Sequence, residues 1–123
     1  VETLNPSLDT SLLKTDSSSI FLISVPPRFL KVPEDTIAYE KQDVELVCQA
    51  YGKPEPKIQW LKNGEVITDN DYLQVVNGYN LKILGLMKLD AGIFQCVAVN
   101  AAGNVQAAAR LTVLQPGTLL IIN

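Results

Sequence analysis

The sequence predicts an all-β domain built as a sandwich of two sheets, and two features carry this prediction. From Arg28 onward, short apolar runs recur about every ten residues and are separated by Gly, Pro, Asn and Asp, a spacing typical of sandwich strands. Both cysteines and the single tryptophan lie within such runs. No segment has an amphipathic helical period long enough to predict a helix in the core.

Composition excludes several classes of function. The 123 residues, 47 % of them apolar, suffice for one domain with a core and are too few for two. The absence of histidine and the presence of only two cysteines exclude His-based triads and leave Cys/His metal sites short of ligands. A net charge of −3 has the wrong sign for a protein that binds phosphate backbones. We therefore expect no enzyme, no cofactor, no metal and no nucleic-acid partner.

Residues 1–25 are predicted to form a flexible N-terminal arm. The first 19 residues are rich in Ser and Thr and lack aromatic side chains, so they cannot offset their own ordering entropy. Pro26 and Pro27 have fixed φ angles and no N–H groups, so they are expected to end any strand before them. The domain is predicted over residues 26–115, with a C-terminal linker over 116–123. The apolar run at Ile20–Ile23 is far shorter than the roughly 20 residues that span a bilayer, and we expect no direct membrane contact.

Alternation of apolar and polar residues indicates the inward face of each strand. Four runs carry this signal, and their expected inward side chains are Val44, Leu46, Cys48 and Ala50; Ile58 and Trp60; Phe94, Cys96 and Ala98; and Val105, Ala107, Ala109, Leu111 and Val113. Trp60, Phe94 and Leu81 are the predicted centre of the core. Between these runs, Asn63-Gly64 and Asn77-Gly78 supply residues that tolerate positive φ in turns, and residues 100–104 are expected to close a hairpin.

Cys48, Trp60 twelve residues later and Cys96 at the end of the run 90–96 have the Cys…Trp…Cys spacing of an immunoglobulin sandwich. A disulfide between the sheets with an indole packed across it would fill the centre of such a core. The alternative is a pair of reduced, buried thiols in an intracellular protein. The even count of two cysteines at this spacing favours the oxidised, extracellular interpretation.

The sequence resembles an I-set immunoglobulin domain over residues 26–114, in the strings Pro26–Phe29, Gly52–Trp60, Asn80–Ile83 and Asp90–Gly92. It is also similar to the fourth Ig domain of the DCC and neogenin family of netrin receptors, in the strings 38–40, 60–64, 71–76, 80–86 and 94–96. The resemblance implies an immunoglobulin-like (I-set) two-sheet Greek-key sandwich. The chain departs from the pattern in three places: Phe94 stands where a tyrosine would place the hydroxyl of the tyrosine corner, Leu89 occupies a position that is usually small and polar, and no arginine precedes Tyr72 as a partner for Asp90.

The resemblance also implies a function. It indicates a non-catalytic recognition and spacer module in the extracellular part of a plasma-membrane receptor for cell adhesion or axon guidance. The implied partners are neighbouring Ig or fibronectin type III modules and a protein ligand, and the residues before Pro26 would be the remnant of a preceding module. The rival interpretation is an intracellular structural I-set domain of a muscle or cytoskeletal protein, whose task is mechanical.

Two surface features are candidates for binding. Leu61, Val97 and Val99 are expected to point outward on neighbouring strands of one sheet, which suggests a contact surface, although scattered exposed apolar residues are ordinary. Ala108, also outward, would let another backbone approach closely.

Lys53, Lys57 and Lys62 lie close in sequence and suggest weak binding of sulfated polysaccharide. A mixed, solvated surface is the alternative, because Glu45, Glu55 and Glu65 lie close in the same part of the sequence.

Overall fold

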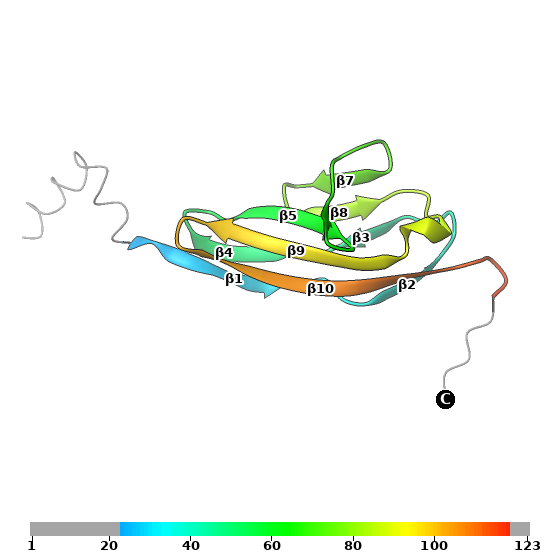
Figure 1. The fold of residues 1–123 in the computed structure, drawn as a ribbon, viewed down its shortest axis with the longest axis horizontal. Helices are drawn as coiled ribbons and strands as arrows, with labels where there is room; N and C mark the ends of the chain where they lie inside the picture. The colour runs from blue at the N-terminus through cyan, green and yellow to red at the C-terminus, as the bar shows by residue number, and fades with distance from the viewer. Residues whose placement is uncertain (1–22, 119–123) are drawn as a thin grey trace, which may run out of the picture.

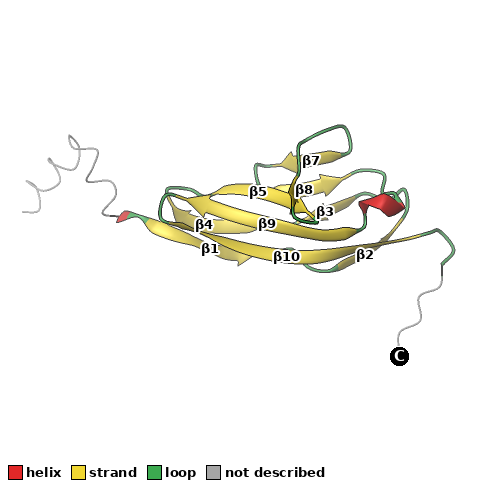
Figure 2. Cartoon of the chain, viewed as in Figure 1, coloured by secondary structure: helices red, strands yellow, loops and turns green. Residues whose placement is uncertain are grey.

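The computed structural model describes residues 23–118, which form two layers of β-sheet (Figure 1). The strands are β1 (Val25–Lys31), β2 (Thr36–Tyr39), β3 (Val44–Leu46), β4 (Gln49–Lys53), β5 (Lys57–Lys62), β6 (Glu65–Val66), β7 (Leu73–Val76), β8 (Asn80–Ile83), β9 (Gly92–Asn100) and β10 (Gly103–Leu114). A short 3-10 turn, η2 (Lys88–Asp90), precedes β9 (Figure 2).

The first layer is a five-stranded sheet in the order β2-β10-β9-β5-β6. Its long central strands, β9 and β10, run side by side along the domain (Figure 1). Strand β2 is parallel to β10, whereas β9 is antiparallel to both β10 and β5. Because one side of this sheet faces the core, apolar and polar residues alternate along its strands.

The second layer contains the sheet β3-β8-β7 and the pair β1-β4. Strands β3 and β4 belong to one extended run, interrupted at Val47 and Cys48. Neighbouring strands of both layers are mostly not consecutive in sequence, so the chain crosses repeatedly between the layers. The predicted all-β, two-sheet Greek-key sandwich is confirmed.

The predicted turns are present. Asn63 (φ 49°) and Gly64 (φ 87°) connect β5 to β6, and Asn77 (φ 57°) and Gly78 (φ 81°) lie between β7 and β8. Asn and Gly adopt positive φ at lower cost than other residues, so these dipeptides specify the hairpins locally. The predicted hairpin at residues 100–104 joins β9 to β10.

The core lies between the layers and is centred on a disulfide. Cys48 of the second layer is bonded to Cys96 of β9, with their Cα atoms 6.5 Å apart. Trp60, opposite Cys96 in the β5–β9 register, is buried with Leu81 and Phe94. The predicted disulfide bond is thus present, with the indole beside it.

Strand β1 differs from the sequence-based prediction. It begins at Val25 and contains Pro26 and Pro27, which were expected to end any strand before them. The prolines fit because β1 lies at the edge of its pair with β4 and the register shifts between Val25 and Arg28, an arrangement in which missing N–H groups break no continuous ladder. The carbonyl of Val25 also accepts a hydrogen bond of 2.8 Å from Asn100 Nδ2. Val25 therefore belongs to the sandwich, whereas residues 1–22 of the predicted arm lie outside the described residues.

Asn80 is the buried polar side chain of the second layer, only 7 % exposed. Its Oδ1 accepts the backbone N–H of Cys48 at 3.1 Å, and its Nδ2 donates to Glu45 Oε2 at 2.9 Å. A buried amide is tolerated when its groups are hydrogen-bonded. Here the side chain of Asn80 supplies the hydrogen-bond acceptor for Cys48, which lies between β3 and β4 and is outside both strands.

Exchanging the amide for a carboxylate at Asn80 tests this network. Asn80→Asp keeps an acceptor for Cys48 but brings a second oxygen toward Glu45, so the free energy of unfolding should fall by about 2–3 kcal/mol in a urea titration. The double variant Asn80→Asp/Glu45→Gln restores a donor facing an acceptor and should recover most of the loss, whereas Glu45→Gln alone should cost less than about 1 kcal/mol. A double variant as unstable as Asn80→Asp would show that the two side chains do not act as a pair.

Candidate interaction surface

The outer face of the five-stranded sheet carries the four predicted interface residues. Val97 and Val99 follow each other on this face of β9. Leu61 of β5 and Ala108 of β10 both lie opposite Gln95, the residue two positions before Val97. Residues in such diagonal positions are about 7–8 Å apart, so the four side chains form one set around Val97.

Amide side chains separate the members of this set. Val97 lies between Gln59 of β5 and Gln106 of β10 in the register of the sheet. Gln95 Nε2 donates a hydrogen bond to Gln106 Oε1. The face is therefore a mixture of apolar and uncharged hydrogen-bonding groups, a composition suited to contact with another protein surface that retains some water.

Charge is confined to the two ends of this face. Among the residues that the register places on it, Lys57 lies at one end beside Val99, and Arg110 lies toward the other end beside Ile93. No acidic residue of the described strands shares the face. A partner with uncharged groups at its centre and acidic groups at its rim would be complementary to it.

Three further apolar residues on this face were missed by the sequence-based prediction. Ile37, Val66 and Ile93 are 54 %, 57 % and 37 % exposed, and the register places each of them on the outer side, opposite Thr112, Leu61 and Arg110 respectively. Extending the alternation of β9 back by two residues would have found Ile93. Strands β2 and β6 have only four and two residues, too few for a recognisable period.

The predicted basic cluster is wrong in one member. Lys57 and Lys62 begin and end β5, about 17 Å apart at the usual rise of a strand. Five positions separate them, an odd number, so their side chains leave opposite faces of the sheet. Only Lys53 and Lys57, on either side of the loop 54–56, remain to support binding of a polysaccharide.

Lys62 instead completes the corner that lacks a tyrosine hydroxyl. Its Nζ donates a hydrogen bond to the carbonyl of Leu89 and lies 5.9 Å from the centroid of the Phe94 ring, within the range of a cation–π contact. Phe94 fills the core with no exposed surface. The ammonium group thus bonds to a carbonyl five residues upstream of Phe94, in the region that a corner tyrosine would reach.

Two hollows of about 630 and 520 Å³ open on the surface, one beside β3 and the other between β4 and the turn after β7. Within residues 23–118, no group of three or more His, Cys, Asp or Glu is placed to hold a metal ion. The same residues contain no helix long and apolar enough to cross a membrane.

Residues 27–113 match the family model described as Immunoglobulin I-set domain. Netrin receptor DCC of Rattus norvegicus is 48 % identical over 100 residues, which are 81 % of this chain and 7 % of that protein. Neogenin of Mus musculus is 45 % identical over 93 residues, 76 % of this chain and 6 % of that protein. The chain therefore spans less than a tenth of the length of these relatives.

Solved structures share the fold. A chain from the complex of titin with the obscurin-like 1 Ig domain has a TM-score of 0.72 and 34 % identity, covering 76 % of this chain and 99 % of that one. The structure of Sidekick-1 immunoglobulin domains 1–4 has a TM-score of 0.69 and 34 % identity, covering 73 % of this chain and 24 % of that one. The same sandwich is thus found in a titin complex and in a protein with several such domains.

The Lys62 contact predicts a measurable contribution to stability. Lys62→Met keeps the length of the side chain but removes the donor and the charge over Phe94, so the free energy of unfolding should fall by about 1 kcal/mol in denaturant. Lys57→Met, at the exposed start of the same strand, should change it by less than about 0.5 kcal/mol. Adding Phe94→Tyr should stabilise the Lys62→Met variant more than the parent, because the carbonyl of Leu89 is then unoccupied. Equal effects in both backgrounds would contradict this assignment.

Proposed function

Since the chain belongs to the immunoglobulin I-set family, we propose that it is a non-catalytic protein–protein recognition and spacer module in the ectodomain of a cell-surface receptor for adhesion or axon guidance. One observation carries this proposal. Identity to Netrin receptor DCC and to neogenin reaches 48 % and 45 % across most of the chain. We place the domain outside the cell, with neighbouring Ig or fibronectin type III modules and a protein ligand, netrin among the candidates.

The disulfide supports an extracellular location. Bridges between cysteines form and persist in oxidising compartments and are rare in the cytosol. Closing a loop of 48 residues should contribute about 4 kcal/mol in the chain-entropy model, comparable to the whole stability of a marginal domain. A domain that depends on its bridge to this extent is suited to an environment that keeps it oxidised.

The rival function is that of an intracellular structural domain. The likeness to a chain of the titin complex, at 34 % identity and a TM-score of 0.72, favours it. The sandwich alone does not separate the two, because the same fold serves many functions. The higher identity to the two receptors favours the extracellular role.

We assign recognition to the outer face of the five-stranded sheet, centred on Val97. This face combines uncharged glutamines with exposed apolar residues such as Val66 and Val99. Interfaces of this kind depend on a few central residues surrounded by contacts that exclude water. Either a protein ligand or an adjoining module of the same receptor would fit this description.

Location and redox state together test the receptor assignment. Antibodies against this domain should label intact, non-permeabilised cells that express the parent protein. The domain recovered from them should be lighter than its reduced form by two hydrogen atoms and should resist thiol alkylation in denaturant. Labelling only after permeabilisation, with two thiols that react, would establish the intracellular alternative.

Val97→Glu tests the recognition face. In the receptor ectodomain we expect at least tenfold weaker netrin binding if the ligand lies on this face, or an increased radius of gyration in solution scattering if a neighbouring module does. The free energy of unfolding should fall by less than about 1 kcal/mol, because Val97 points outward. Leu89→Glu, an equal change at an exposed apolar residue on η2, is the matched control. No effect on binding or on shape would remove this face from consideration.

A further inference from the structure

The course of β1 leaves one edge of β3 open. Strand β1 pairs with β4 as far as Lys31, opposite Gln49. The chain then passes through residues 32–35 to β2, which pairs with β10 in the other layer. Strand β3, which precedes β4 in the same extended run, pairs with β8 on one side, and no described strand pairs with its other side.

The backbone groups that face this open edge can be assigned from the alternation of the strand. The N–H of Cys48 points toward β8, where it bonds to Asn80 Oδ1 at 3.1 Å. Backbone groups of successive residues in a strand point in opposite directions, so Leu46 also faces β8. Glu45 and Val47 therefore direct their N–H and C=O groups to the open edge, where β1 no longer lies beside them.

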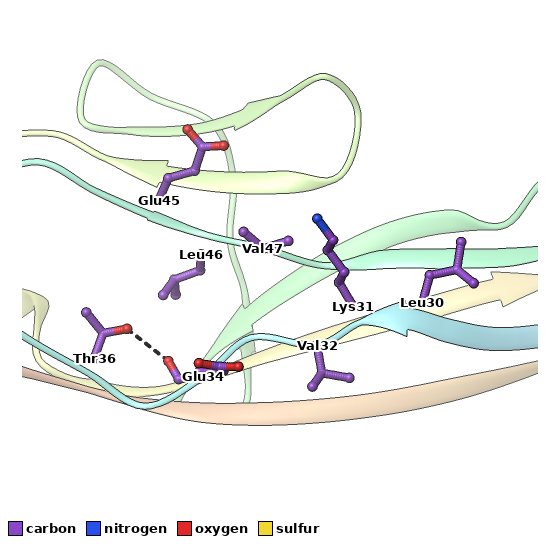
Figure 3. A pocket seen from close by; sticks show the side chains of 8 residues that line it. All are labelled: Leu30, Lys31, Val32, Glu34, Thr36, Glu45, Leu46 and Val47. Atoms are coloured by element: carbon purple, nitrogen blue, oxygen red, sulfur yellow. Dashed lines mark hydrogen bonds between the residues drawn. The ribbon is translucent and has the colours of Figure 1, made fainter.

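A groove of about 630 Å³ runs along this edge (Figure 3). Leu30, Lys31 and Val32, at the end of β1, line one side of it, and Leu46 and Val47 line the other side from the extended run. The charged lining residues are Lys31, Glu34 and Glu45. The groove therefore combines apolar walls, an excess of one negative charge and a strand edge without a neighbour.

We propose that this groove binds an extended peptide of a partner protein by adding a strand to the open edge of β3. Strand addition draws its affinity from main-chain hydrogen bonds and its specificity from pockets for alternate side chains. The backbone groups of Glu45 and Val47 provide the main-chain contacts, and the apolar walls accept an alternating apolar side chain. Because the lining contains two glutamates and one lysine, the groove favours a peptide that places a Lys or Arg near Glu34.

The surrounding charges also explain why the edge does not pair indiscriminately. Charged side chains beside an exposed strand are a common protection against aggregation. Lys31 and Glu34 both line the groove (Figure 3), so they disfavour an uncharged strand and tolerate one of matching charge. This argument depends on the strand edge and on the charges beside it, and it holds for either cellular location of the domain.

Amide hydrogen exchange on the 123-residue chain, read by NMR, tests the proposal. The probe is the synthetic peptide acetyl-TVKVTVKT-amide, and its control is the same sequence with every backbone nitrogen methylated. Exchange of the Glu45 and Val47 N–H groups should slow at least tenfold with the probe and remain unchanged with the control. Unchanged exchange with the probe, or equal slowing with the control, would overturn strand addition.

Hydrogen exchange measured without the peptide distinguishes two alternative occupants of the groove: another part of this chain and a second copy of it. Protection of both amides at all protein concentrations would mean that residues of the chain outside 23–118 already occupy the edge. Protection that grows with protein concentration would mean that a second copy does. Either result overturns the proposal of a partner peptide.

A charge reversal tests the selectivity. Glu34→Lys should weaken binding of the probe by about two- to fivefold, the equivalent of one exposed ion pair. Glu65→Lys makes the same change of charge on β6 in the other layer and should leave binding unchanged. Equal losses of binding in both variants would show general charge attraction and would overturn the assigned site. Thermal melts of both variants serve as the control that they are folded.

Discussion

The bond between Cys48 and Cys96 is the constraint from which the other surfaces follow. It joins the two layers at a Cα separation of 6.5 Å and turns both residues inward. Because side chains alternate along a strand, an inward Cys96 makes Phe94 and Ala98 inward as well, and it makes Val97 and its alternate neighbours outward. The proposed recognition face of the five-stranded sheet is therefore the opposite side of the same arrangement that fills the core.

Asn80 links the core to the open edge in a similar way. Its Oδ1 accepts the N–H of Cys48. Cys48 lies at the point of the extended run where pairing with β8 ends and pairing with β1 begins. The hydrogen bond to Asn80 holds Cys48 in line with the β3–β8 pairing, which leaves the backbone groups of Glu45 and Val47 on the side of the groove. A single buried amide thus connects packing in the interior to hydrogen-bonding capacity on the surface. This coupling is a reason for a polar residue in a position that an apolar one could otherwise fill.

The sequence predicted the features that depend on the local pattern of residues. The alternation around Cys48 and Cys96 and the turns at Asn63-Gly64 and Asn77-Gly78 need only neighbouring residues, so the layers and hairpins were predictable. The contact of Lys62 with Leu89 and the placement of Pro26 within an edge strand depend on pairing between distant segments. The open edge of β3 was equally inaccessible, because it exists only where β1 leaves one layer for the other.

The fold by itself does not choose between a receptor and a muscle protein, since both use this sandwich. What separates such domains is the chemistry of their surfaces and the compartment that their bonds require. Here the outer face around Val97 belongs to the five-stranded layer, whereas the groove lies beside β3 of the other layer and reaches the five-stranded layer only at Thr36 of β2. Because the lining of the groove contains none of the residues grouped around Val97, contact at one surface leaves the other accessible. A spacer module in a chain of domains could therefore meet a neighbouring module and an extended segment of a second protein at the same time.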